Sequence, residues 1–196
     1  MTSDPSNGYE AIAAEFIADR GARPDVGVGV RTVREWARAL RAGSAVLDLG
    51  CGPGYPIASV LVEAGLDVYG VDASPTMVEQ FRARFPAVPV ECDGVETSDF
   101  FGRGFDGVIA WGLLFLLSPT VQVDVIERVA GVLVRGGRFL FTAPLQACEW
   151  SDVMTLRRSE SLGAEAYRRH LVAAGLQLDR EAEDEGGNHY YMAVKP

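Results

Sequence analysis

A glycine-rich loop and the acidic residue that follows it are the features of the sequence best suited to bind a ligand. Gly50, Gly52 and Gly54 alternate directly after the apolar run 46–49. Glycine adopts positive φ without strain and lets a ligand approach the backbone, so this loop can present backbone N–H groups to a bound molecule. Asp72 ends the next apolar run, where an acid accepts hydrogen bonds from ribose hydroxyls. The pattern predicts a site for a cofactor that contains a nucleoside.

Residues after two later apolar runs extend this candidate site. Asp93 and Gly94 follow the third run, where a carboxylate and the backbone are placed to contact an adenine edge. Trp111 ends the fourth run. Because open α/β sheets bind ligands in a crevice at the carboxyl ends of their strands, we expect all of these residues to meet the glycine loop there.

The spacing of the glycines distinguishes two classes of cofactor. The dinucleotide fingerprint is G-x-G-x-x-G, whereas this loop has G-x-G-x-G followed by Tyr55. Asp48, inside the strand before the loop, would repel a pyrophosphate but attract the amino group and sulfonium of a methionine moiety. These features favour a sulfonium cofactor, and a nicotinamide-dependent oxidoreductase is the main alternative from another chemical class.

Aromatic and polar residues outside these motifs are candidates for binding a second molecule. Tyr9 lies in the N-terminal segment, and Trp150 and Asp152 follow the fifth apolar run. His189 and Tyr190 are adjacent near the C-terminus, and His189 is a candidate general base. We predict that Trp150, Asp152 and Tyr190 bind substrate, although each side chain also suits a purely structural role.

The elements that must position these residues alternate along the chain. Short apolar runs suit strands buried on both faces of a parallel sheet, and the segments between them have helical spacing. This order predicts an α/β, Rossmann-like, doubly wound fold: a mostly parallel seven-stranded sheet with an N-terminal helical lid and an antiparallel C-terminal hairpin. The predicted strands are 45–49, 68–71, 88–92, 107–111, 138–142, 177–182 and 189–194, and the predicted helices are 8–18, 25–40, 55–64, 75–85, 119–135 and 164–174.

Length and composition narrow the functional classes. The 196 residues suit one domain, and a net charge of −9, from 27 acidic and 18 basic residues, repels phosphate backbones. We therefore expect no nucleic-acid partner. The three cysteines have no metal-ligand spacing, which argues against a metal site and suits reduced thiols in the cytoplasm. No apolar run is long enough to span a bilayer, so we expect no membrane partner. The oligomeric state stays open.

The motifs resemble those of a known superfamily. The segment 47–54 (LDLGCGPG) resembles the first motif of the class I S-adenosylmethionine-dependent methyltransferases, and 71–77 (VDASPTM) resembles their second motif. The segment 132–139 resembles the entry into their fifth strand, with Arg-Gly-Gly where Pro-Gly-Gly is commoner. The likeness covers 44–142 and specifies the cofactor but not the substrate.

The resemblance implies a role for each matching residue. Gly50 and Gly52 would hold the methionine portion of S-adenosylmethionine near Asp48, and Asp72 would bind the ribose. Ala73 and Met77 would line one face of the adenine, Asp93 and Gly94 would contact its amino group, and Trp111 would close over the cofactor. The full set of predicted cofactor-binding residues is Tyr9, Asp48, Gly50, Cys51, Gly52, Gly54, Asp72, Ala73, Met77, Asp93, Gly94 and Trp111.

The same resemblance implies a division of the chain and a reaction. Residues 1–42 would form the lid, 44–142 the cofactor-binding core, and 143–196 the acceptor-side loop, helix and terminal hairpin. Many members carry a histidine after the fourth strand, but 113–117 (LLFLL) has none. We expect methyl transfer to a small-molecule acceptor. A protein or RNA methyltransferase and a non-catalytic cofactor-binding module are the alternatives, and the methylated atom stays open.

Overall fold

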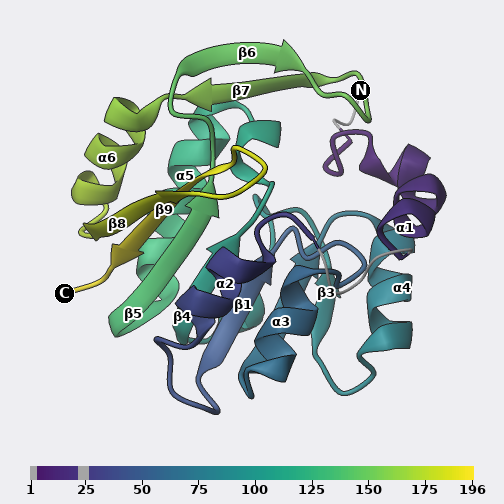
Figure 1. The fold of residues 1–196 in the computed structure, drawn as a ribbon, viewed down its shortest axis with the longest axis horizontal. Coiled ribbons are helices and arrows are strands. Elements are labelled where there is room, and N and C mark those ends of the chain that lie inside the picture. The colour runs from purple at the N-terminus through teal and green to yellow at the C-terminus, as the bar shows by residue number, and fades with distance from the viewer. Residues whose placement is uncertain (1–3, 22–26) are drawn as a thin grey trace.

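Seven strands form one sheet in the order β3-β2-β1-β4-β5-β9-β8 in the computed structural model, which describes residues 4–21 and 27–196 (Figure 1). β9 runs antiparallel to β5 and β8, and the other neighbours are parallel. This confirms the predicted sheet and its antiparallel terminal hairpin. The strands are β1 Ala45–Leu49, β2 Asp67–Asp72, β3 Val90–Cys92, β4 Phe105–Ala110, β5 Leu133–Thr142, β8 Gln177–Glu183 and β9 His189–Val194.

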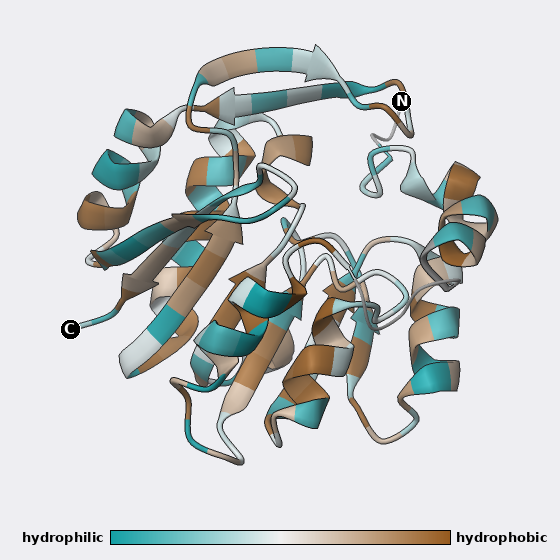
Figure 2. Ribbon diagram, viewed as in Figure 1, coloured by the Kyte–Doolittle hydropathy of each residue, from teal (hydrophilic) through white to brown (hydrophobic). Residues whose placement is uncertain are grey.

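Helices cover both faces of the sheet, as a doubly wound fold requires. Helices α5 and α6 pack on one face around Phe139, Phe141 and Tyr191, and α2 and α3 pack on the other around Val46 and Leu140. Hydrophobic residues are concentrated along the strands, and the outer helices carry hydrophilic residues on part of their surface (Figure 2). The α-helices from residue 30 onward are α2 Val30–Ala37, α3 Ile57–Glu63, α4 Pro75–Arg84, α5 Pro119–Val132 and α6 Ala164–Ala173.

Element boundaries differ most from the prediction at α2 and where α5 meets β5. Helix α5 ends at Val132 rather than at residue 135, because β5 already begins at Leu133. The early start of β5 is stabilised by backbone hydrogen bonds that join Gly136 and Gly137 to Lys195. The helix predicted over 25–40 begins partly outside the described residues, and its described part is α2, preceded by Gly29 with φ 84°.

The N-terminal segment, residues 4–21, lies against the start of α4. It contains the 3₁₀ helix η1 (Tyr9–Ile12) and helix α1 (Ala13–Gly21), where the sequence predicted one helix. The Glu10 carboxylate accepts hydrogen bonds from Ser74 Oγ, from Thr76 N at 3.2 Å and from Thr76 Oγ1 at 2.7 Å. A carboxylate at a helix N-terminus interacts favourably with the helix dipole. Glu10 therefore anchors this segment to the start of α4.

The segment after β5 forms a two-stranded hairpin where the resemblance implied an acceptor-side loop. Strands β6 (Ala147–Ser151) and β7 (Arg158–Leu162) are antiparallel and extend above the carboxyl ends of the main sheet (Figure 1). Nearly all side chains of β6 are exposed, so this strand lacks the buried apolar pattern on which the prediction relied. Within the described residues, no helix is long and apolar enough to cross a membrane.

Candidate cofactor and acceptor site

A cavity of about 420 Å³ opens at the carboxyl ends of the central strands. Its walls come from the loop after β1, the ends of β2, β4 and β5, the N-terminal segment, the 3₁₀ helix η3 (Leu114–Leu116) and the tip of the β6–β7 hairpin. This position beside the change in strand order is where doubly wound folds bind ligands. The predicted site residues that line the cavity are Tyr9, Gly50, Cys51, Gly52, Asp72, Ala73, Met77, Trp111 and Asp152.

The glycine loop has the backbone conformation that explains its composition. Gly50, Gly52 and Gly54 have φ values of 67°, 52° and 87°. A Cβ added at Gly52 would meet no atom within 4 Å, whereas a Cβ at Gly54 would lie 2.5 Å from Cε2 of Phe85. Gly54 does not line the cavity. Gly54 allows the loop to pack on α4, while Gly50 and Gly52 face the space available to a ligand. A contact of Gly54 with the cofactor stays a prediction.

Asp72 joins the glycine loop to the start of α4. Its Oδ2 accepts a hydrogen bond from Gly52 N at 2.8 Å, and its Oδ1 accepts one from Ser74 N at 2.8 Å. Burial raises the pKa of Asp72 above its ordinary value, although these two N–H donors favour the carboxylate. Each carboxylate oxygen can accept a further hydrogen bond. Asp72 thus retains the capacity to bind two hydroxyl groups of a ligand in the cavity.

Asp48 is buried at 1% exposure and does not line the cavity. Its Oδ2 has no hydrogen-bond partner within the described part of the chain. Burial, with a further contribution from the charge of Asp72, raises the pKa of Asp48 well above its ordinary value. Strand side chains alternate between faces, so Asp48 shares the face of Val46 beneath α2 and α3. Its contact with the cofactor amino group stays a prediction.

The loop after β3 uses its predicted residues to form a turn. Asp93 Oδ1 accepts hydrogen bonds from Gly94 N at 2.8 Å and from Thr97 Oγ1 at 2.6 Å. Neither Asp93 nor Gly94 lines the cavity, but Val95 does. The apolar residue directly after the predicted pair therefore supplies the wall of the cavity. Asp93 and Gly94 form the turn beside it, and their contact with the adenine stays a prediction.

The N-terminal segment and the hairpin tip meet above the cavity. Tyr9 OH donates a hydrogen bond to Asp152 Oδ2 at 3.4 Å, and Arg157 forms an ion pair with Asp4 at 3.1 Å. Asp152 Oδ1 is occupied by N–H donors of the tip. Trp150 does not line the cavity but packs on Phe115, which does, with 5.4 Å between the ring centroids. Asp152 and Trp150 therefore shape the roof of the cavity.

His189, the predicted general base, does not line the cavity, and its role as a base stays a prediction. Its ring packs edge-on against Tyr191, and its Nε2 lies 3.8 Å from Glu181 Oε1. Burial lowers its pKa, although Glu181 acts in the opposite direction. The alternation of side chains along β9 directs His189 and Tyr191 toward α6, away from Tyr190, and Asn188 is the neighbouring residue that reaches the cavity.

Several lining residues were not predicted from the sequence. They come mainly from the N-terminal segment, the segment around η3, the end of β5 and the hairpin tip. They form no sequence motif because these elements are far apart along the chain. No lysine, arginine or histidine is among the described lining residues, which include the acids Asp19, Asp72 and Asp152. The unpredicted lining residues include Asp19, Leu113, Phe115, Leu116, Thr142, Val153, Met154 and Asn188, whereas Phe16 was expected in the N-terminal lid.

Comparison with known proteins agrees with this geometry. Residues 46–137, which contain the glycine loop and Asp72, match the family model described as "Methyltransferase domain". The chain is 30% identical over 150 residues to the aklanonic acid methyltransferase DauC of Streptomyces sp. (strain C5), covering 71% of this chain and 61% of that protein. Residues 46–137 are therefore a methyltransferase domain, of the superfamily that uses S-adenosylmethionine.

One solved structure shares the fold of this chain, and one further protein is similar to it in sequence. The magnesium protoporphyrin IX methyltransferase (ChlM) from Synechocystis PCC 6803, solved with bound S-adenosylmethionine, superposes with a TM-score of 0.72 at 20% identity and covers 95% of this chain and 97% of its own. The probable tRNA methyltransferase 9B of Bos taurus is 31% identical over 109 residues, covering 55% of this chain and 23% of that protein. The chain thus spans only part of the length of the curated relatives it matches.

The residues of the cavity fit the cofactor of this family. Gly50 and Gly52 leave backbone exposed to a ligand, Asp72 has spare acceptor capacity for ribose hydroxyls, and Ala73 and Met77 offer apolar surface to an adenine. The described walls offer no cationic side chain to a pyrophosphate, so the site does not favour a nicotinamide dinucleotide.

Proposed function

We propose that this protein transfers the methyl group of S-adenosylmethionine to a small organic molecule that is neutral or positively charged and largely apolar. The observation that carries the proposal is the composition of the cavity beyond the glycine loop. Phe16, Phe115, Leu116 and Met154 supply apolar surface there, and no basic residue lines it within the described chain. Such walls favour an apolar or cationic ligand over a carboxylate or a phosphate.

The position of the acceptor follows from the order of the strands. If Asp72 at the end of β2 binds the ribose and the loop after β1 binds the methionine portion, the methyl group faces the ends of β4 and β5. Trp111 lies at the end of β4 and Thr142 at the end of β5, where Thr142 Oγ1 accepts a hydrogen bond from Gly112 N at 2.8 Å. We place the acceptor between these residues and the hairpin tip.

The reaction requires little from the side chains beyond orientation. Bound S-adenosylmethionine would supply a methyl group already activated by its sulfonium. The protein would align the acceptor atom with the methyl group and the sulfur, and effective molarities from such alignment are large. The roof formed by Tyr9 and Asp152 would exclude water. We assign no general base, because Asp152 already accepts hydrogen bonds at both oxygens.

An RNA acceptor is the second candidate, since some relatives act on tRNA by their names. Binding to RNA depends on Lys and Arg contacts to phosphates. The chain carries a net charge of −9, and its described cavity walls carry no basic residue. These features support a small molecule over RNA.

A labelling experiment tests the proposal. The protein is incubated with S-adenosylmethionine tritiated on the methyl group and, separately, with the low-molecular-mass, RNA and protein fractions of a bacterial extract. We expect label to enter the low-molecular-mass fraction and the Asp72→Ala variant to transfer far less. Label in the RNA or the protein fraction, with none in the small molecules, would overturn the proposed acceptor class.

A further inference from the structure

A chain of hydrogen bonds leads from the cavity wall into the β8–β9 hairpin. Trp111, which lines the cavity, donates from Nε1 to the hydroxyl oxygen of Tyr190 at 2.8 Å. Tyr190 is fully buried and donates its own hydroxyl proton to Asp184 Oδ2 at 2.7 Å. The sequence predicted Tyr190 as a substrate-binding residue, but its side chain does not reach the cavity. Its contact with the site passes through Trp111.

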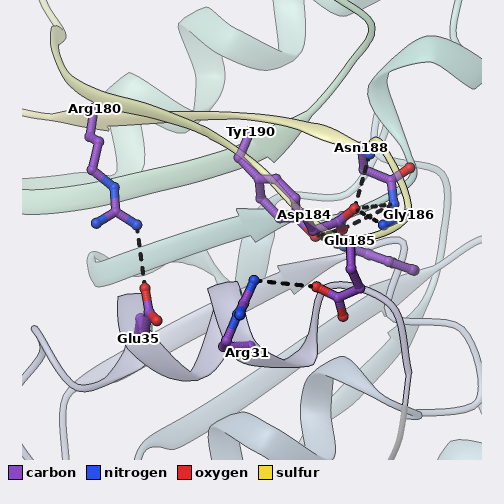
Figure 3. Close-up of polar contacts among 9 residues, drawn as sticks. Arg31, Glu35, Arg180, Asp184, Glu185, Gly186, Asn188 and Tyr190 are labelled. Carbon is purple, nitrogen blue, oxygen red and sulfur yellow. Dashed lines mark hydrogen bonds and ion pairs between the residues drawn. The ribbon is translucent and has the colours of Figure 1, made fainter.

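Asp184 is the last residue in this series of hydrogen bonds, and its carboxyl group is held in one position. Its Oδ1 accepts hydrogen bonds from Gly186 N at 2.9 Å and Asn188 N at 3.0 Å, so the turn of the hairpin holds the carboxyl group in place (Figure 3). Burial by itself raises the pKa of Asp184, but the hydrogen bonds from Tyr190 and Asn188 outweigh it and lower the pKa. Asp184 is therefore a carboxylate at neutral pH, and hydrogen bonds to a charged acceptor are the strong ones.

The residue before α2, Gly29, packs against the hydrogen bond between Trp111 and Tyr190. A Cβ added at Gly29 would collide with the Tyr190 hydroxyl and lie 2.8 Å from Trp111 Nε1. Two ion pairs, Arg31 with Glu185 and Arg180 with Glu35, each at 3.6 Å, connect α2 to the β8–β9 hairpin (Figure 3). Exposed ion pairs contribute little energy, so the close packing at Gly29 is the stronger constraint. The indole N–H of Trp111 is thus held between α2 and the hairpin.

We propose that Asp184 and Tyr190 are positioning residues of the methyl-transfer site, which hold the Trp111 indole in the orientation that completes the cofactor and acceptor cavity. This inference deepens the proposed function, on which it rests for the role of the cavity. An indole without these partners would have more rotamers available, and restricting them on ligand binding costs free energy. Loss of the hydrogen bonds that link Trp111, Tyr190 and Asp184 should therefore weaken ligand binding and change the environment of the Trp111 indole N–H.

The test removes one hydroxyl and follows the Trp111 indole and the affinity for S-adenosylhomocysteine. In ¹⁵N-labelled Tyr190→Phe, we expect the indole N–H signal of Trp111 to shift and to exchange with solvent faster. The Kd for S-adenosylhomocysteine, measured by calorimetry, should rise about threefold to tenfold, as expected for one lost hydrogen bond. Asp184→Asn should act in the same direction, because its amide can keep Oδ1 for the turn but cannot accept from Tyr190.

Tyr191→Phe is the matched control. Tyr191 is the buried neighbour on the other side of β9, and its hydroxyl has no hydrogen-bond partner in the described part of the chain. This variant should leave both readouts unchanged. A second check uses Trp111→Phe, which has no indole N–H: in that background Tyr190→Phe should cost no further affinity.

Three results would overturn the proposal. The Trp111 indole signal could be unmoved in Tyr190→Phe, or the Kd of Tyr190→Phe for S-adenosylhomocysteine could equal that of the parent. In the Trp111→Phe background, Tyr190→Phe could cost as much affinity as it does in the parent protein. None of these measurements needs an acceptor. If the labelling experiment finds no small-molecule acceptor but Tyr190→Phe behaves as expected, the proposed function fails and the positioning role stands. If the label enters small molecules but Tyr190→Phe behaves like the parent protein, only the positioning role fails.

Discussion

Replacing Asp72 tests the link between one side chain and the cofactor. In the free protein the carboxylate accepts one hydrogen bond from Gly52 N and one from Ser74 N, each at 2.8 Å, and keeps a lone pair on each oxygen for a ribose hydroxyl. A hydrogen bond to a charged group contributes about 1.5–3 kcal/mol. Asp72→Ala should therefore raise the Kd for S-adenosylhomocysteine about 10-fold to 150-fold.

Calorimetry gives the Kd, and a thermal melt of the free variant shows whether it is folded. Asp72→Asn keeps the volume and one acceptor oxygen, so its Kd should lie between those of the parent and Asp72→Ala. Asp67→Asn is the matched control, because Asp67 begins the same strand at its opposite end and is exposed. A folded Asp72→Ala variant that binds S-adenosylhomocysteine as tightly as the parent would refute the ribose assignment.

Three further predictions concern the charges and glycines around the loop. Because burial raises the pKa of Asp72, its carboxylate protonates at a higher pH than an ordinary aspartate, so calorimetric affinity for S-adenosylhomocysteine should fall as the pH drops, and Asp72→Asn should lose this dependence. Asp48 also has a raised pKa, so the folded state binds its proton more tightly than the unfolded state and stability declines as pH rises above the unfolded value near 4. Asp48→Asn should therefore raise the denaturation midpoint at pH 8 but not at pH 4, and a loss of stability at pH 8 would show that the charged group is satisfied. Gly54→Ala should lower the free energy of unfolding by at least about 1–2 kcal/mol, because it adds backbone strain and its Cβ meets Phe85. Gly52→Ala adds the same backbone strain, but its Cβ enters open space, so this variant should lose more affinity for S-adenosylhomocysteine than its loss of stability explains. Equal effects of the two substitutions on binding would contradict this assignment.

The sequence predicted the fold well because the strands that build it are buried. Strand β1 is buried along its whole length, so its apolar run ends where the strand ends. The β6–β7 hairpin escaped prediction for the opposite reason. Its side chains do not pack into the main core, and no regular apolar pattern marked the strands.

The site was predictable where one short segment determines it. Gly50, Gly52 and Asp72 line the cavity because the loop after β1 and the end of β2 are local structures that the residue types specify. Whether a side chain faces the cavity elsewhere depends on turn geometry or on strand alternation. Asp93 turns back to bind its own loop, and a shift of one residue separates Asn188, in the cavity, from His189, outside it. Neither outcome is encoded in residue type.

The acceptor half of the cavity is harder to predict from the sequence, because residues far apart along the chain form it. Tyr9 and Asp152 are 143 positions apart and meet only because the N-terminal segment and the hairpin tip converge above the sheet. Trp111 and Tyr190 are 79 positions apart. Trp111 directly follows β4 and Tyr190 lies in β9, and these two strands are not neighbours in the sheet. Such pairs carry no spacing signal, so they become visible only in three dimensions.

A crystal structure with S-adenosylhomocysteine tests the central claim most directly. The account predicts the ribose hydroxyls within hydrogen-bond distance of the Asp72 carboxylate, the adenine beside Met77 and Val95, and the sulfur directed toward the space between Trp111 and Thr142. A ligand bound with its ribose away from Asp72, or with its sulfur facing away from that space, would contradict the account.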